Sequence, residues 1–128
     1  MTKQVIRTEQ APAPFQGAPY NQAIVANGFV FVAGQLGVDP SSGEVVEGGV
    51  GPQTERVFAN LAAILEAAGS SLEALVKTTV FLTNLDDFAA MNDVYSHSIG
   101  PTPPARSTVE VGRLPAGALV EIESIALA

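Results

Sequence analysis

The sequence contains no cysteine and only one histidine, His97. Without cysteine the chain can form neither a disulfide nor a thiolate metal site, and a single histidine cannot build a histidine cluster. His97 falls in the last turn of a predicted helix, where a cation is favoured by the helix dipole. We therefore expect a structural role for this histidine.

Basic residues are scarce as well, with six Lys and Arg against thirteen Asp and Glu and a net charge of −7. Nucleic acids and anionic membranes both require a positive surface, so we expect neither as a partner. No stretch approaches the ~18 apolar residues of a membrane span, and the start MTKQVIRTEQ lacks the apolar segment of a signal peptide. These observations predict a cytoplasmic protein in which any anionic ligand is held locally.

The chain is rich in apolar residues and poor in charge, since hydrophobic residues make up 47% and charged residues 15% of its length. Its 128 residues have the usual length of one domain, so we expect a single domain over residues 1–128. An apolar excess of this kind indicates that part of the surface meets another subunit.

Local signals predict the order strand, strand, helix, strand, helix, strand, strand, with an additional strand near residues 4–7. Asn27-Gly28 suits a tight hairpin turn between two β-rich runs. Pro52 suits a first helical turn and Gly69 a helix stop, and Asn84 or Asp86 can cap the second helix. The later strands are predicted at residues 76–83, 106–113 and 119–128, the last two joined at LPAG.

This order predicts an α+β fold in which two helices cover one face of a mixed sheet. The segment FVFVAG (residues 29–34) is apolar on both faces of its strand, whereas a face open to water alternates with polar residues. The uncovered face of the sheet must therefore be buried by a partner, most simply by another copy of the chain.

Two charged residues, Arg106 and Glu121, lie inside strand-like segments. Such charges are rarely buried without a partner, so they form either a structural ion pair, exposed strand ends, or part of a functional site. If LPAG closes a short hairpin, Glu110 faces Glu121, and Arg106 lies ~13 Å along the ladder. The two residues could then meet only across a subunit interface.

Three other polar residues are weaker candidates. Tyr20 lies in a loop and could either pack or present its hydroxyl to a ligand. Asn92 follows Phe88 by four residues, beside the apolar face of the second helix, where its amide needs a partner such as the backbone or a ligand. Lys77 has a strand-end position that favours simple solvation.

Several segments in order resemble the Rid/YjgF family, and within it the reactive intermediate deaminases. They are PYNQA (19–23), FVAGQLGVDPSSGEVV (31–46), ILEAAG (64–69), VKTTVFL (76–82), FAAMNDVY (88–95), PARSTVEV (104–111) and VEIESIA (120–126). The resemblance implies a chorismate-mutase-like fold, a homotrimer with a central β-barrel, and clefts between neighbouring subunits. It also implies hydrolysis of 2-iminobutanoate and 2-iminopropanoate to 2-keto acids and ammonia, which removes reactive metabolites.

The resemblance also assigns roles to individual residues. Arg106 matches the arginine that holds the substrate carboxylate, and Glu121 matches the glutamate that positions the hydrolytic water. The matching substrate-binding positions are Tyr20, Ala33, Gly34, Asn92 and Thr108, and the family uses no metal and no organic cofactor.

The chain departs from the family pattern at several points. It has Ala18 and Ala33 where many members carry glycine and serine, and Thr108 where some members carry cysteine. The segment SHSIGPTP (96–103) replaces aromatic residues that are common in the family. These departures bear on substrate size. Two other functions remain open, a non-catalytic sensor of small carboxylic acids and a regulatory or chaperone-like trimer. A ribonuclease role is disfavoured because six scattered basic residues make no phosphate track.

Overall fold

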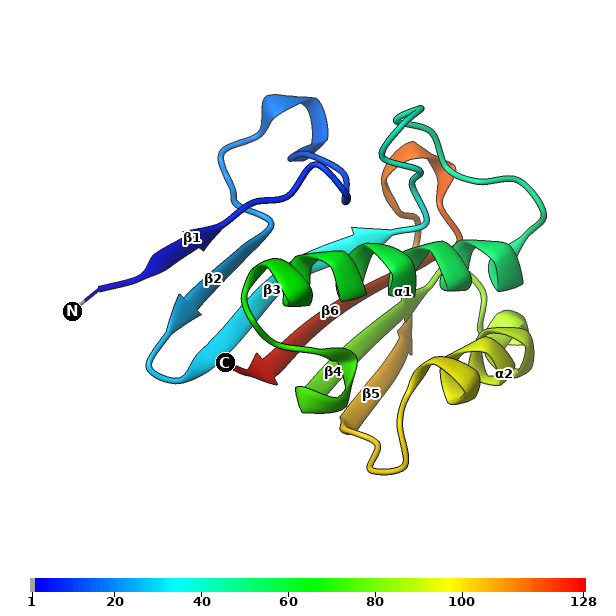
Figure 1. Cartoon of the computed structure of the whole chain (residues 1–128). Helices are drawn as coiled ribbons and strands as arrows, with labels where there is room; N and C mark the ends of the chain where they lie inside the picture. Colours follow the sequence, from blue (N-terminus) through cyan, green and yellow to red (C-terminus); the bar gives the residue numbers. More distant parts are fainter. Residues whose placement is uncertain (1) are drawn as a thin grey trace.

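Residues 2–128, which the computed structural model describes, form one six-stranded mixed sheet with two α-helices packed on the same face (Figure 1). The strand order is β1-β2-β3-β6-β4-β5, and only β4 and β5 run parallel. The strands are β1 (Gln4–Ile6), β2 (Ala23–Ala26), β3 (Phe29–Leu36), β4 (Leu75–Leu82), β5 (Ala105–Glu110) and β6 (Val120–Leu127), and the helices are α1 (Val50–Ala67) and α2 (Phe88–Ser98). The predicted α+β class is confirmed.

Most turns form where the local signals predicted them. Asn27 and Gly28 both have positive φ, 52° and 83°, as a two-residue hairpin turn between β2 and β3 requires. Gly69, with φ of 76°, follows the end of α1 and stops the helix. The Asn84 side chain accepts a hydrogen bond from the Asp86 backbone N–H at 2.8 Å, which caps the short 3₁₀ turn before α2.

The predicted hairpin between the last two strands is wrong. β5 and β6 do not pair, because β4 lies between them and bonds to both. The chain passes from β4 through α2 to β5, and such a crossover places β5 parallel to β4 at the sheet edge. The LPAG segment forms a 3₁₀ turn, Pro115–Gly117, within a longer connection that carries the chain to the other side of β4.

The hydrophobic core lies between the helices and one face of the sheet. Alternate strand residues, such as Val30 on β3, Val80 on β4 and Ile122 on β6, are fully buried beneath α1 and α2. None of the helices in residues 2–128 is both long enough and apolar enough to cross a membrane. Each of the two helices contributes one apolar stripe to the core between helices and sheet.

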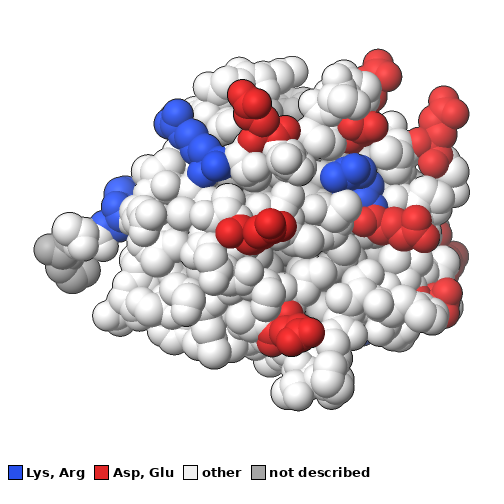
Figure 2. Space-filling model, viewed as in Figure 1, with Lys and Arg blue, Asp and Glu red and all other residues white. Residues whose placement is uncertain are grey.

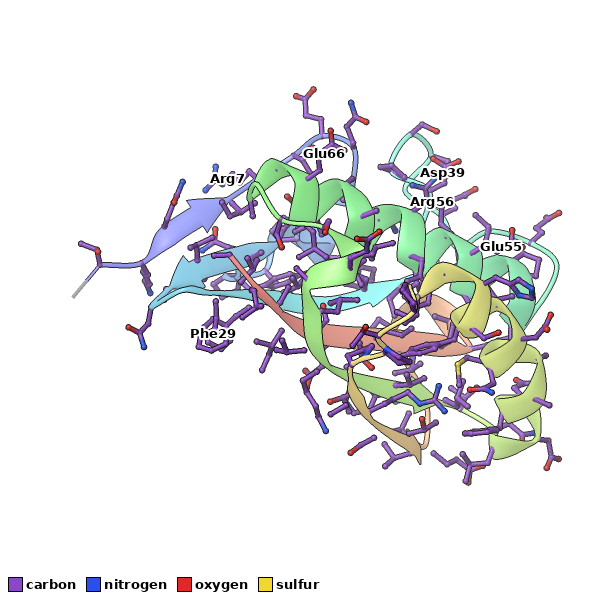
Figure 3. The ribbon with its side chains drawn as sticks, turned by 60° about the horizontal axis from the view of Figure 1, so that its bottom comes forward. Arg7, Phe29, Asp39, Glu55, Arg56 and Glu66 are labelled. Carbon is purple, nitrogen blue, oxygen red and sulfur yellow. The ribbon has the colours of Figure 1, made fainter. Side chains whose placement is uncertain are left out.

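The opposite face of the sheet carries large apolar side chains that remain exposed. The register places Phe29, Phe31 and Leu127 on this face, with exposed fractions of 37%, 44% and 49%. Val5 on β1 and Val109 on β5 extend the same surface to both edges. Figure 3 shows Phe29 projecting from the sheet on the side away from α1. The expectation that this face is apolar is confirmed.

Two buried polar residues of α1 fix the loop that follows β3. The Asn60 side-chain amide donates to the carbonyls of Leu36 and Val38 at 3.2 and 2.9 Å. Gln53 accepts a hydrogen bond from the Leu119 backbone N–H at 2.8 Å. Gly37 packs so closely on Gln53 that an added Cβ would lie 2.7 Å from its backbone. The ends of β3 and β6 are thus held against one helix.

A buried glutamine, Gln22, holds the N-terminal loop. Its side-chain oxygen accepts from the Thr8 N–H at 2.7 Å, and its amide nitrogen donates to the carbonyls of Thr8, Ala11 and Pro12 at 3.0, 3.1 and 2.8 Å. The side chain is 4% exposed. One residue therefore satisfies several backbone groups that would otherwise lie unpaired beside the sheet.

We predict that Gln22→Met destabilises the protein by about 1–3 kcal/mol, because it fills similar space but leaves these backbone groups without partners. Urea unfolding followed by circular dichroism measures the change. Gln10→Met is the matched control, since Gln10 is exposed and a surface change of this kind costs less than about 0.5 kcal/mol. Equal stabilities of the two variants would contradict the assigned role of Gln22.

Candidate active site

Arg106, on the edge strand β5, is held by neutral groups. Its Nη1 donates to the side-chain oxygen of Asn92 on α2 at 2.8 Å. Its Cζ lies 4.6 Å from the centre of the Tyr95 ring and 5.4 Å from the centre of the Phe88 ring. The side chain is half-buried on the helix-covered face of the sheet. None of these contacts neutralises the charge, so the guanidinium is suited to an anionic ligand.

Asn92 is thus placed beside Arg106 by the fold. The two residues are 14 apart in the sequence, and the crossover from β4 through α2 to β5 brings them together. The expected alternative, a hydrogen bond from Asn92 to the backbone, is not the contact made. Because Asn92 accepts from one N–H of the guanidinium, the other N–H donors can still bind a ligand.

Glu121, on β6, projects from the opposite face of the sheet. Burial of the carboxylate, assisted by the neighbouring charge of Glu123, raises the pKa of Glu121 above its usual 4.5. A Cβ on residue 34 would collide with the Glu121 carboxylate as it is placed here, so a larger residue there would displace the Glu121 side chain. The β-bulge between Val32 and Gln35 places Gly34 in this contact.

Arg106 and Glu121 do not share a pocket within one chain. Phe81 on β4 pairs with Glu121 on one side and with Val109 on the other, which places Glu121 level with a residue three positions beyond Arg106. With two strand spacings between them, the separation is roughly 14 Å, and the side chains lie on opposite faces. The predicted separation agrees with the structure, although the hairpin that suggested it is absent.

Tyr20 and Gly34 line a common cavity of about 420 Å³ between the N-terminal loop and the end of β3. The Tyr20 hydroxyl accepts a hydrogen bond from the Phe15 N–H at 2.6 Å, and the ring is 43% exposed. Both backbone polar groups of Ala33 are engaged, its N–H by the Gln22 carbonyl and its C=O by the Gln35 side chain. The structure thus brings Tyr20, Gly34 and Glu121 to one end of the sheet.

The remaining predicted residues divide between the two faces. Thr108 lies two residues after Arg106 on the helix-covered side, and its hydroxyl is buried without a hydrogen-bond partner. Lys77 lies on the exposed face, where its Nζ donates to the Ser107 hydroxyl at 3.2 Å. Ring nitrogen Nδ1 of His97 contacts the Asp93 carbonyl at 2.7 Å in the last turn of α2.

The electrostatic surface is dominated by acids. On the face seen in Figure 2 the basic side chains stand apart from one another among more numerous Asp and Glu. In the part of the chain that the structure describes, no three His, Asp or Glu side chains gather in a way that could hold a metal ion. Against this acidic surface, the positive charge of Arg106, which has only neutral contacts, is the feature best suited to bind an anion.

Sequence reasoning missed two residues that shape these sites. Gln22 was visible in the PYNQA segment, but nothing in the pattern showed how many carbonyls its amide reaches. Tyr95 packs in the core at 6% exposure, and its ring also faces Arg106. A polar-tipped aromatic on an apolar helix stripe was the available signal.

Comparison with known proteins agrees with the fold and with the motifs. The Ribonuc_L-PSP family, described as Endoribonuclease L-PSP, matches residues 8–128. The chain belongs to the Rid/YjgF/L-PSP (RutC) family. A RutC family protein of Pyrococcus abyssi is 54% identical over 126 residues, covering 98% of each chain. The 2-iminobutanoate/2-iminopropanoate deaminase of Capra hircus is 41% identical over 127 residues, covering 99% of this chain and 91% of the goat protein.

Solved structures of the Rid family superpose closely on this chain. RidA from the Antarctic bacterium Psychrobacter sp. PAMC 21119 has a TM-score of 0.92 at 46% identity, covering 98% of this chain and 99% of its own. E. coli TdcF, solved with bound serine, has a TM-score of 0.89 at 39% identity, covering 98% of both chains. The sheet order and the placement of both helices are therefore those of the Rid fold.

The raised pKa of Glu121 predicts a pH-dependent cost in stability. The folded protein holds this proton more tightly than the unfolded chain does, so the free energy of unfolding falls as pH rises from 4.5 through the folded pKa. Glu121→Gln has no titrating group at this position, so its free energy of unfolding does not fall in this way. Its melting temperature should gain on that of the wild type between about pH 4 and pH 8.

Thermal melts across this pH range measure the effect. Glu123→Gln is the control, because Glu123 is exposed and contributes only the smaller cause of the shift. If the melting temperatures of wild type and Glu121→Gln differed by the same amount at every pH, the raised pKa of Glu121 would be ruled out.

Proposed function

We propose that the protein hydrolyses small 2-imino acids, such as 2-iminobutanoate and 2-iminopropanoate, to 2-keto acids and ammonia. The observation that carries the proposal is the half-buried guanidinium of Arg106, whose contacts are neutral, in a chain of this family. The relatives named 2-iminobutanoate/2-iminopropanoate deaminase support the substrate class.

In this proposal Arg106 anchors the substrate carboxylate. A guanidinium binds a carboxylate through two parallel N–H···O bonds, which fix the orientation of the ligand as well as its position. Asn92 occupies one donor, and the Tyr95 and Phe88 rings restrict the plane of the group. A carboxylate bound there leaves the adjacent imine carbon at a defined place relative to the protein.

Glu121 is proposed to act on water. A protonated imine is already electrophilic, so hydrolysis requires a water oriented toward its carbon and a group that accepts a proton. The raised pKa makes the Glu121 carboxylate a stronger base than an exposed glutamate. Water adds to the imine carbon to form a carbinolamine, and the C–N bond then breaks to release ammonia and the keto acid. Tyr20, Ala33, Gly34, Asn92 and Thr108 are the proposed substrate-binding positions.

Both groups can reach one substrate if the protein assembles as a closed homotrimer. Arg106 and Glu121 lie on opposite faces of the sheet in one chain, so a shared cleft needs Arg106 from one subunit and Glu121 from its neighbour. The exposed apolar face around Phe29, Phe31 and Leu127 provides the surface that such an assembly would bury. A central barrel built from the three sheets would meet both requirements.

A second candidate function is binding of small carboxylic acids without turnover. The structure of E. coli TdcF with bound serine favours it, because serine carries the same carboxylate as an imino acid. An assay with an amino acid oxidase, which generates the imine in place, and semicarbazide as a trap distinguishes the two. An enzyme lowers semicarbazone formation at catalytic concentration, whereas a binder does not.

We predict that Arg106→Lys loses activity nearly as fully as Arg106→Ala. The lysine keeps the charge but not the two-pronged geometry, and two charge-assisted hydrogen bonds of about 1.5–3 kcal/mol each correspond to a loss of about 100-fold or more in kcat/KM. The semicarbazone assay measures activity, and calorimetry with 2-ketobutyrate measures binding.

Light scattering and thermal melts serve as controls, and both variants should keep the wild-type mass and fold. Arg113→Ala is the matched control for loss of a cation, because Arg113 is exposed and lies in the connection between β5 and β6, outside the sheet. A folded Arg106→Ala protein that remains fully active would remove Arg106 from the proposed site.

We predict a particle of three chains in light scattering at micromolar concentration. Phe31→Glu places a charge on the apolar face and should shift the mass toward the monomer, because a buried unpaired carboxylate is unfavourable. Leu85→Glu changes a comparably exposed apolar residue on the turn before α2 and should leave the mass unchanged. A wild-type monomer would contradict the assembly.

A further inference from the structure

Tyr95 is more than a core residue. Its ring is 6% exposed and packs edge-on against Phe58 on α1, with centroids 5.4 Å apart and planes at 80°. Its hydroxyl is hydrogen-bonded to the hydroxyl of Thr78 at 2.7 Å, and Thr78 is fully buried on β4. The ring is therefore fixed at its tip and at its edge, while one face is directed at the Arg106 guanidinium.

The register explains why these residues meet. Thr78 pairs directly with Arg106 in the parallel ladder between β4 and β5, so both side chains emerge at the same level and on the same face. Tyr95 lies on α2 directly above, three positions after Asn92, which places the two on one side of the helix. Asn92 then holds the guanidinium by a hydrogen bond, and the Tyr95 ring lies against the guanidinium, with its centre 4.6 Å from Cζ.

We propose that Tyr95, fixed by Thr78, is a positioning residue for Arg106 that sets the plane of the guanidinium presented to a carboxylate ligand. The inference rests on the proposed function of Arg106 as the anchor. An aromatic face attracts a cation most strongly when both are shielded from water, as the burial of Tyr95 provides. Phe88, which is 39% exposed and farther from Cζ, contributes less.

The test compares Tyr95→Phe with Tyr95→Leu. The phenylalanine keeps the ring and should stay within about threefold of wild type in both KM and the calorimetric Kd for 2-ketobutyrate. The leucine removes the ring face and should raise both constants by about tenfold, with kcat changed by less than about twofold, because a carboxylate anchor acts on ground state and transition state alike.

Phe88→Ala tests the second, weaker ring contact to Arg106. Phe88 is exposed enough for alanine to be tolerated, and its loss should raise the same two constants by about threefold without a change in mass. If the two rings had a purely structural role, the variants would lose stability instead of affinity. Their melting temperatures would fall, and the folded variants would keep wild-type KM and Kd.

The outcomes separate this inference from the proposed function. A folded Tyr95→Leu protein with unchanged Kd and KM, while Arg106→Ala abolishes binding, overturns the positioning role and leaves the anchor standing. Should Tyr95→Leu not fold, Tyr95→Met, which also lacks the ring, is judged in the same way. Unchanged binding in Arg106→Ala itself overturns the anchor, and the positioning role falls with it. If the wild type binds 2-ketobutyrate without turnover, the calorimetric comparison alone decides the role of Tyr95.

Discussion

The chain's crossover from β4 through α2 to β5 is the constraint on which the rest of the site depends. It makes β5 a parallel edge strand and lays α2 across its helix-facing side. Arg106 can then reach Asn92 and Tyr95, which come from the helix that the crossover itself contains. If β5 instead formed an antiparallel hairpin with β6, β4 would not lie beside β5. Thr78 would then not pair with Arg106, and its hydrogen bond to Tyr95 would not hold the ring next to the guanidinium.

The two faces of the sheet differ in character. One face buries the core and carries the guanidinium, and the other carries Glu121 and an apolar surface that water would not keep exposed without cost. The raised pKa of Glu121 is a sign of the same arrangement, because a carboxylate kept partly away from water is unfavourable for folding and useful for proton transfer. This cost to folding falls on the same face of the sheet as the exposed apolar side chains, which is the face that the proposed assembly would cover.

Much of the fold could be predicted because its signals are local. Asn27-Gly28 specified a hairpin through backbone conformation alone, and Gly69 ended α1 for the same reason. The partner of β5 could not be predicted in this way, because it depends on where the connection through α2 returns the chain to the sheet, which no short stretch of sequence encodes. LPAG lies between two consecutive strands and so suggested a hairpin, but β4 lies between those strands in the sheet.

The candidate site shows the same division. The charge of Arg106 in a strand was visible in the sequence, and the motifs around it identified the family. The neutral character of its surroundings was not visible, since Asn92 and Tyr95 lie 14 and 11 residues away and could equally have faced solvent or core. Arg106 and Glu121 lie on opposite faces of the sheet, so a cleft shared by them would require a second chain.

The overall charge of −7 bears on which ligands such a site accepts. Repulsion from scattered surface carboxylates is screened beyond about 10 Å, so a small monoanion experiences it only weakly on approach. At contact distance the Arg106 guanidinium outweighs those more distant charges, because the interaction grows as the separation shrinks and the surroundings are partly dry. A polyanion would still meet the acidic surface along its length. The same charge imbalance therefore opposes a polyanion such as nucleic acid more strongly than it opposes a small carboxylate.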